Sequence, residues 1–304
     1  MTPANRWRIQ SLLLALLAQA LTVLPVSLAI PASLREMTDT APANAAIPMG
    51  NLSEVQNESY AMVLAKYVDS EGMVNYKDLK EDREPLDRYV ESLAVLDPNV
   101  YEQLSTDEKI AFWINAYNAL TLQTIINHYP ITKGGLISGL RFPENSIRQI
   151  PGVWDEISHR VMGREMTLNN IEHDTLRKQF SEPRIHMALV CASMDCPPLR
   201  REPYMADRLD AQLDDQARRF LASPRKFRID RAKHIVYLSS IFKWFAPDFS
   251  VRYGKDPSQG DPSEVSTVLE FVSLYVNAED AQQLKTVDHK VKYIDYDWSL
   301  NEQK

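Results

Sequence analysis

The most informative stretch for the fold covers residues 105–128, which read STDEKIAFWINAYNALTLQTIINH. Ser105 supplies an N-cap hydroxyl, and Asp107 and Glu108 place acids in the first turn, where the helix dipole favours them. Tyr129-Pro130 ends the pattern, because proline disfavours a helical conformation in the residue before it. Apolar residues occur on almost every side of this predicted helix, as is typical of a helix buried all round. We therefore predict that it is the central helix of the protein.

Shorter helices and a few strands are predicted around this helix. Apolar spacing and turn residues indicate further helices at residues 60–67, 86–96, 168–177, 209–221, 241–249 and 265–275. Strand patterns occur as a hairpin at 159–167, a buried strand at 185–191, a pair at 227–229 and 235–238, and a late strand at 291–294. Helices outnumber strands and the two mix irregularly. The predicted fold class is α+β, a single helix-rich domain with a small mixed or antiparallel sheet.

The N-terminus predicts export. Arg6 and Arg8 form a positively charged segment, residues 12–30 are almost wholly apolar, and Ser27-Leu28-Ala29 fits the small-x-small cleavage pattern. We therefore divide the chain into a signal peptide (1–29), a disordered linker (30–51) and one folded domain (52–304). The mature protein is expected to be periplasmic or secreted. An uncleaved membrane anchor is the alternative, since the apolar run approaches the length that spans a bilayer.

Composition and charge narrow the classes of partner. The chain has 304 residues, of which 44% are hydrophobic and 25% charged, as in ordinary globular proteins. Its net charge of −7 argues against nucleic-acid binding, which requires clustered Lys and Arg. The expected partner is an unknown peptide or small-molecule substrate, or another protein. Contact with a membrane is expected only through the signal segment, if that segment is not cleaved.

Both cysteines of the chain lie in the segment 184–200, which reads RIHMALVCASMDCPPLR. The predicted strand delivers Cys191 at its end, and Pro197-Pro198 stiffens the exit from the loop that follows. Cys191 and Cys196 could form a disulfide, a redox pair or two separate thiols. A cysteine nucleophile needs a base or a positive environment to form its thiolate. Backbone N–H groups of residues 192–195 could then form an oxyanion hole.

His173 is the better candidate for that base. On a regular strand, His186 and Cys191 would point to opposite faces, so these two are not expected to be partners. Glu172 precedes His173, and Arg177 lies four residues later on the same face of a predicted helix. A structural histidine and a dipole-complementing arginine are the simpler alternatives.

Two amides on the central helix, Asn115 and Asn118, share one face. Buried amides need partners, so they could brace neighbouring loops; alternatively, one of them orients the catalytic imidazole or binds an oxyanion. We take Cys191, His173, Asn115, Asn118 and Glu172 as the candidate catalytic residues. The candidate substrate-binding residues in or beside the same segments are Arg177, Arg200, Ser193 and Trp113.

No cofactor is predicted. The chain has only nine glycines, no Gly-rich phosphate loop, and neither GxSxG nor HExxH. Cys191, Cys196, His173 and His186 could bind a metal, but their spacing matches no strong zinc pattern, so no metal ligands are assigned. The aromatic residues of the C-terminal tail, 293–301, are expected to dock onto the domain.

These segments together resemble the domain of unknown function 547 family. The matching pieces are residues 67–72, 111–120, 171–177, 184–200, 241–249 and 296–301, which span nearly the whole mature chain. The resemblance implies exported bacterial relatives and plant relatives joined to coiled-coil segments, without an established activity. It also implies that plant-type relatives keep counterparts of His173 and Cys191 but carry serine near Cys196. Cys191 would then be the functional thiol, and an obligatory disulfide is not expected.

Three hypotheses follow. The first is a cysteine-dependent hydrolase or acyltransferase with a papain-like or transglutaminase-like fold, in which the Cys191 sulfur lies close to a nitrogen of His173 in a cleft. The second is a non-catalytic binding or scaffold domain, with both side chains buried and no open pocket beside them. The third is a thiol redox or metal-binding protein, which for a disulfide requires Cα atoms of Cys191 and Cys196 within about 7 Å.

Overall fold

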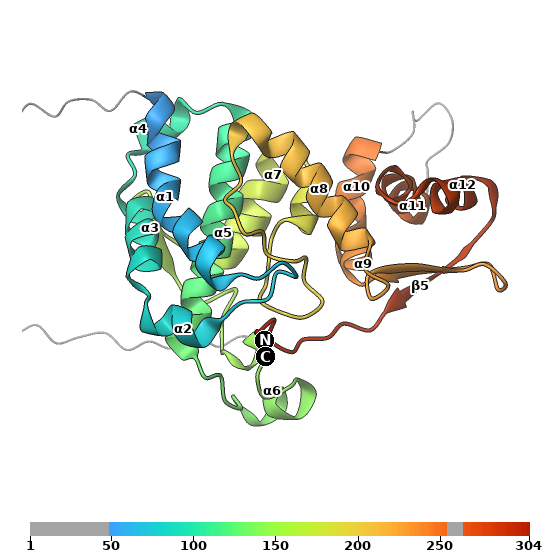
Figure 1. Ribbon diagram of the computed structural model, residues 1–304, viewed down its shortest axis with the longest axis horizontal. Helices are drawn as coiled ribbons and strands as arrows, with labels where there is room; N and C mark the ends of the chain where they lie inside the picture. Colours follow the sequence, from blue (N-terminus) through green and yellow to red (C-terminus); the bar gives the residue numbers. More distant parts are fainter. Residues whose placement is uncertain (1–48, 254–263) are drawn as a thin grey trace, which may run out of the picture. The chain divides into compact units, whose positions relative to one another are not determined.

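The computed structural model describes residues 49–253 and 264–304, which belong to one compact unit of the chain (Figure 1). The predicted signal peptide and nearly all of the predicted linker lie outside the described residues. Helix α1 (Met49–Tyr67) already begins within the last three residues of the predicted linker. None of the described helices combines the length and the apolar character needed to cross a bilayer.

The central helix is confirmed as α5 (Thr106–His128). The Ser105 hydroxyl accepts a hydrogen bond from the Glu108 backbone N–H, and the Glu108 carboxylate accepts one from the Ser105 N–H, which completes a capping box. Sixteen of the helix residues are buried, including every position from Ile110 to Leu122. Around it lie α1, α2 (Tyr76–Glu81), α3 (Glu84–Val95) and α4 (Pro98–Glu102) (Figure 1).

A second hydrophobic cluster is built by the C-terminal part of the chain. Strands β3 (Phe227–Asp230) and β4 (Ile235–Ser239) pair antiparallel, and β5 (Lys290–Ile294) adds to β4 in parallel, so this small sheet is mixed. The helices of this part are α8 (Leu209–Leu221), α9 (Ile241–Trp244), α10 (Ala246–Tyr253), α11 (Glu264–Tyr275) and α12 (Ala278–Thr286). Phe242, Phe249 and Phe271 are fully buried at its centre. The helix-rich α+β prediction agrees with these elements.

Shorter elements connect the helices packed around α5 with this C-terminal cluster. The predicted hairpin is confirmed as β1 (His159–Val161) and β2 (Arg164–Met166), and Met162 and Gly163 adopt positive φ at its turn. Helix α6 (Leu136–Arg141) and 3₁₀ turns at Ile147–Gln149 and Ala206–Arg208 lie in the connections. The predicted helix at 168–177 is a π-helical segment, Asn170–Leu176, followed by the short α7 (Arg177–Gln179). Such segments recur at functional sites.

The predicted buried strand at 185–191 is wrong. Pro183–Met187 form a 3₁₀ helix, and the chain from there to Cys191 is irregular. Pro183 fixes a φ angle suited to the first helical position, and the Glu182 carboxylate accepts a hydrogen bond from the Arg184 N–H. The segment is buried as predicted, but a short apolar run does not by itself distinguish a strand from a helical turn.

The C-terminal tail docks onto the domain, as predicted. The Tyr76 hydroxyl donates a hydrogen bond to Asn301 Oδ1 at 2.6 Å, and the Val74 N–H donates to the Asn301 carbonyl at 2.9 Å. Leu300 forms an isolated β-bridge with Ser193, and the Met194 N–H donates to the Ser299 carbonyl at 2.8 Å. The tail thereby holds the loop that carries the two cysteines.

Candidate functional site

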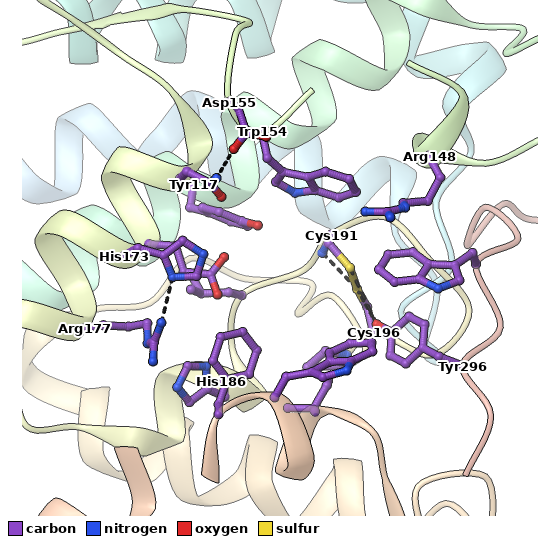
Figure 2. Close-up of a pocket in the computed structure, with 18 residues that line it drawn as sticks. Tyr117, Arg148, Trp154, Asp155, His173, Arg177, His186, Cys191, Cys196 and Tyr296 are labelled. Atoms are coloured by element: carbon purple, nitrogen blue, oxygen red, sulfur yellow. Dashed lines mark hydrogen bonds between the residues drawn. A yellow bond between two sulfur atoms is a disulfide. The ribbon is translucent and has the colours of Figure 1, made fainter. Parts of the chain in front are cut away.

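A cavity of about 470 Å³ lies where the central helix, the π-helical segment, the cysteine loop, α9 and the tail meet (Figure 2). Six aromatic side chains line it: Tyr117, Trp154, Trp244, Phe245, Tyr296 and Trp298. Its polar wall consists of Arg148, Asp155, Asn169, Glu172, His173, Arg177 and His186. Both cysteines also reach it. An apolar cavity with a few convergent polar groups is the usual form of a small-molecule site.

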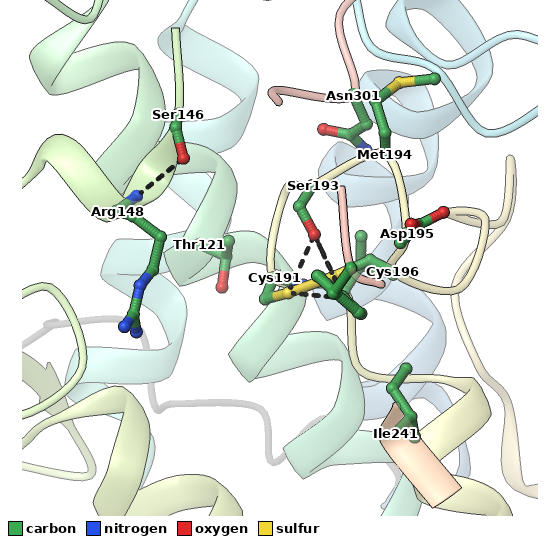
Figure 3. Close-up of a disulfide and its surroundings, with 12 residues drawn as sticks. Thr121, Ser146, Arg148, Cys191, Ser193, Met194, Asp195, Cys196, Ile241 and Asn301 are labelled. Atoms are coloured by element: carbon green, nitrogen blue, oxygen red, sulfur yellow. Dashed lines mark hydrogen bonds between the residues drawn. A yellow bond between two sulfur atoms is a disulfide. The ribbon is translucent and has the colours of Figure 1, made fainter. Parts of the chain in front are cut away.

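Cys191 and Cys196 are joined by a disulfide, with their Cα atoms 6.1 Å apart (Figure 3). Cys191 is half-buried, whereas Cys196 is buried. The residue that follows Cys191, Ala192, adopts a φ of 56°, in the left-handed region that L-residues rarely enter. Both cysteines line the cavity, and Cys191 is the more exposed residue of the two.

Hydrogen-bond donors surround the Cys196 sulfur. The Cys191 backbone N–H lies 3.0 Å from Cys196 Sγ, and the hydroxyls of Ser193 and Tyr296 each lie 3.3 Å from it. The two hydroxyls are also 3.2 Å from each other, so at least one hydroxyl hydrogen remains for the sulfur when one of them donates to the other. The Cys191 sulfur lies further from the same hydroxyls, at 3.5 and 3.6 Å. Donors of this kind stabilise negative charge on a sulfur, and here they are gathered on Cys196 rather than on Cys191.

A buried ion pair holds the cysteine loop in place. Asp195 accepts a hydrogen bond from Lys226 Nζ at 2.7 Å and from the Asp297 backbone N–H at 2.7 Å. Arg225 also pairs with Asp195, at 3.0 Å, and bridges it to the Asp297 carboxylate. Burial lowers the pKa of Lys226, against the opposing effect of Asp195. The loop is thus tied at once to the start of β3 and to the tail.

Glu172 is the buried acid of the cavity. Burial raises the pKa of its carboxyl from an ordinary value of 4.5 to about 7, although the Tyr117 side chain and the charge of Arg177 act in the opposite direction. A carboxyl that titrates near neutral pH can both accept and donate a proton under physiological conditions. Glu172 is therefore suited to acid–base chemistry in the cavity.

Two histidines share a network with Arg177 and Asp248. Arg177 binds Asp248 through two hydrogen bonds of 2.5 and 2.9 Å, and its Nη1 lies 2.9 Å from His173 Nδ1. Because arginine only donates, Nδ1 of His173 is the acceptor. Burial, and then the charge of Arg177, lowers the pKa of His173, so its imidazole is neutral at pH 7.

His186 joins this network through Asp248. Its Nε2 lies 2.7 Å from Asp248, and its ring stacks on Phe245 with centroids 4.0 Å apart. Burial acts to raise the pKa of Asp248, but the hydrogen bonds from His186 and Arg177 outweigh it and lower that pKa. Burial lowers the pKa of His186 despite the nearby carboxylate. We assign a neutral imidazole that donates its Nε2 hydrogen to an ionised Asp248, because a fully buried ring loses more by charging than one shared carboxylate returns.

The structure brings four of the predicted site residues to one cavity: Cys191, His173, Glu172 and Arg177 (Figure 2). Ser193 contacts the Cys196 sulfur and lines a second surface pocket. The predicted contact between the Cys191 sulfur and a His173 nitrogen is not among the hydrogen bonds of the described residues, where Cys191 is bonded to Cys196 instead. The open cavity also differs from the closed environment expected of a scaffold domain.

The other predicted site residues lie elsewhere. Asn118 donates to the Ala188 carbonyl at 3.0 Å and accepts from the Val190 N–H at 2.9 Å, while Asn115 makes the equivalent pair of bonds with the backbone of Tyr204. Both amides therefore brace the segments that enter and leave the cysteine loop. Trp113 donates to the Tyr101 hydroxyl at 2.7 Å in the helical core, and Arg200 pairs with Glu202 and Asp215.

Sequence reasoning missed several residues of the cavity. Arg148, Trp154 and Asp155 come from the connection between α6 and β1, which carries no periodic pattern. Tyr296 and Trp298 belong to the tail that was expected to dock, so their position in the cavity could have been inferred from that expectation. Among residues 49–253 and 264–304, no group of three or more potential ligands is placed to hold a metal ion.

Comparison with known proteins finds one family match to part of the chain and no activity. No curated protein and no solved structure matches the chain, so the expected papain-like or transglutaminase-like fold has no match. One family matches over residues 101–221, a segment that includes α5, Glu172, His173 and both cysteines. Residues 67–72, 241–249 and 296–301, which were also expected to resemble it, lie outside this match. The matched segment corresponds to the family described as "Protein of unknown function, DUF547".

Proposed function

We propose that this chain is an exported thiol–disulfide exchange protein, and that the Cys191–Cys196 pair is its reactive centre. The observation that carries the proposal is the position of the disulfide in the wall of the aromatic cavity, with hydrogen-bond donors gathered on the Cys196 sulfur. A purely structural crosslink has no need of a cavity beside it or of donors on one sulfur. Between turnovers, exchange with a small-molecule disulfide of an oxidising compartment, which is itself reduced to two thiols, would re-form the Cys191–Cys196 bond.

The exchange begins at Cys191, the more exposed sulfur. A substrate thiolate attacks Cys191 Sγ; a bond forms between the two sulfurs, the Cys191–Cys196 bond breaks, and Cys196 leaves as a thiolate. The Cys191 N–H and the hydroxyls of Ser193 and Tyr296 stabilise the charge on that leaving sulfur. Since a thiol of lower pKa leaves faster, these donors accelerate the step.

A second substrate thiol completes the reaction. It attacks the substrate sulfur of the mixed disulfide, which releases Cys191 as a thiolate. Two substrate thiols are thereby oxidised to one disulfide, while Cys191 and Cys196 are reduced to thiols and take up two protons. Glu172, with a pKa of about 7 in the same cavity, accepts protons from the incoming thiols and returns them to the cysteines.

Two matched variants test the order of attack. Cys196→Ser leaves Cys191 as the only cysteine and Cys191→Ser leaves Cys196, so each can form a mixed disulfide with oxidised glutathione at one known position. We expect rapid adduct formation at Cys191 and slow formation at the buried Cys196, measured by mass spectrometry under native conditions. The wild type should also oxidise one equivalent of dithiothreitol while remaining folded. Reduction only after unfolding would show that the disulfide is structural and would overturn the proposal.

A second candidate is a cysteine hydrolase or acyltransferase that works in the reduced state. The observation in its favour is that Cys191 and a neutral His173 line the same cavity. It predicts that reduced protein hydrolyses a panel of esters and amides, and that His173→Ala raises the pKa of the Cys191 thiol in the Cys196→Ser variant. A thiol pKa unchanged by His173→Ala, measured by alkylation rate against pH, would exclude this candidate.

A further inference from the structure

Arg148 has an unusual environment among the polar residues of the cavity. Its guanidinium lies over three aromatic rings, 4.5 Å from the centroid of Phe142, 4.9 Å from Trp298 and 5.2 Å from Trp154. No carboxylate of the described residues lies within ion-pair distance of it. Arg177, the other arginine of the cavity, by contrast donates from Nε and Nη2 to the two carboxylate oxygens of Asp248.

Nearby acids leave the charge of Arg148 largely uncompensated. Asp155 lines the same cavity, but one of its oxygens accepts a hydrogen bond from Asn169. Burial, and then the positive charge of Arg141, lowers the pKa of Arg148, with Asp155 opposing. The electrostatic environment of this cation is therefore unfavourable until a further negative charge approaches.

Aromatic stacking occupies the faces of a guanidinium and leaves its edge, where the N–H donors point, available to an anion. The N–H groups along this edge can donate two parallel hydrogen bonds to one carboxylate. The indoles of Trp154, Trp244 and Trp298 line the same cavity and offer flat apolar surfaces.

We infer that Arg148 is an anion-binding residue, and that the cavity takes a small carboxylate whose flat apolar body packs against these indoles. The inference rests on the proposed function in one respect, which is that the bound carboxylate also carries the thiol that attacks Cys191. Arg148 then selects the substrate by its charge and holds it against the disulfide.

Binding is tested without any redox step. Benzoate is titrated into the oxidised wild type and followed by tryptophan fluorescence, with benzamide as the neutral compound of the same shape. Arg148→Met keeps the length of the side chain and removes its charge. Arg141→Met is the matched control, because it removes a neighbouring charge from an exposed residue that does not line the cavity. We expect Arg148→Met to weaken benzoate binding about tenfold or more, and Arg141→Met to change it little.

The reaction is tested separately with 4-mercaptobenzoate and the neutral 4-mercaptobenzamide as reductants of the disulfide. The ratio of the wild-type rate to the Arg148→Met rate should be about ten for the acid and near one for the amide. Equal benzoate affinity in the wild type and Arg148→Met, with both folded by circular dichroism, would overturn the inference. Benzoate binding that depends on Arg148, together with a disulfide that neither thiol reduces, would support the anion site and overturn the exchange function.

Discussion

The Tyr296 hydroxyl lies 3.3 Å from the sulfur of Cys196, so the C-terminal tail touches a disulfide formed 100 residues earlier in the chain. The same hydroxyl lies 3.2 Å from Ser193 Oγ, and the ring of Tyr296 faces Trp298 with centroids 4.5 Å apart. One side chain therefore contributes both to the aromatic wall of the cavity and to the environment of the leaving sulfur. Chemistry at Cys196 should depend on this contact.

Tyr296→Phe should slow reduction of the disulfide and leave the fold intact. Losing one hydrogen bond to a developing thiolate removes about 1–2 kcal/mol of stabilisation from the leaving Cys196 sulfur. The reduction rate with dithiothreitol, followed by quantifying thiols against time, should drop several-fold. Tyr293→Phe is the control, since that tyrosine lies in β5 and does not line the cavity. Equal rates in the two variants would remove Tyr296 from the mechanism.

Asn118→Ala should destabilise the protein by roughly 2–6 kcal/mol in urea denaturation. The change leaves the Ala188 carbonyl and the Val190 N–H without their buried partner, and each unsatisfied group costs about 1–3 kcal/mol. It should also speed reduction of the disulfide, because the segment that enters the cysteine loop loses its brace.

Asn115→Ala provides the matched control for that experiment. It removes an equivalent pair of bonds, which hold Tyr204 beyond the cysteine loop. We expect a similar loss of stability with an unchanged reduction rate. If Asn115→Ala accelerates reduction as much as Asn118→Ala does, the effect is general loosening of the fold and the local role of Asn118 is refuted.

The sequence predicted best those elements whose signals are local. The capping residues of α5 and its continuous burial follow from Ser105, Glu108 and an apolar run, and all of these act within one helix. The β1–β2 hairpin was predicted equally well from the short turn at Met162-Gly163. Neither prediction required knowledge of the rest of the molecule.

The cavity could be predicted only in part, because its residues meet through tertiary contacts. Glu172, His173 and Cys191 are recognisable candidates by residue type. Arg148 and Trp154 lie in an irregular connection, and they become part of the cavity only through their contacts with each other and with Trp298 of the tail. The wrong strand at 185–191 had the same cause. The apolar residues of this segment are buried as expected. Pro183 and the capping carboxylate of Glu182 favour a 3₁₀ helix there over a strand.

Lys226→Met should cost about 3 kcal/mol or more. It leaves the carboxylate of Asp195 buried, with only the half-exposed Arg225 and one backbone N–H as partners. Lys233→Met, which breaks a solvent-exposed pair with Asp230, should change stability little. The double variant Asp195→Asn with Lys226→Met should recover part of the loss in urea denaturation, since no buried charge is left uncompensated. A double variant no more stable than Lys226→Met would refute this account of the cysteine loop.

Glu172 should make the stability of the protein fall as the pH rises from about 4.5 to about 7. In this window the folded protein keeps the carboxyl protonated while the unfolded chain has released the proton, so raising the pH favours unfolding. The difference between the two pKa values corresponds to roughly 3 kcal/mol, which is complete above pH 7. Glu172→Gln keeps the shape and removes the charge, so it should be more stable than the wild type at pH 8 and similar to it at pH 4. Free energies of unfolding in urea at these two pH values measure the effect.

The anion site predicts a parallel trend in benzoate binding. An ionised Glu172 adds a negative charge to a cavity that already contains Asp155. The charges of Arg148, Arg177 and the neutral His173 are unchanged between pH 7 and 8. Benzoate should therefore bind more weakly to the wild type at pH 8 than at pH 7, and Glu172→Gln should abolish that difference. A wild type whose stability and benzoate affinity are both constant over this range would show that Glu172 is ionised throughout and would remove it as a proton carrier.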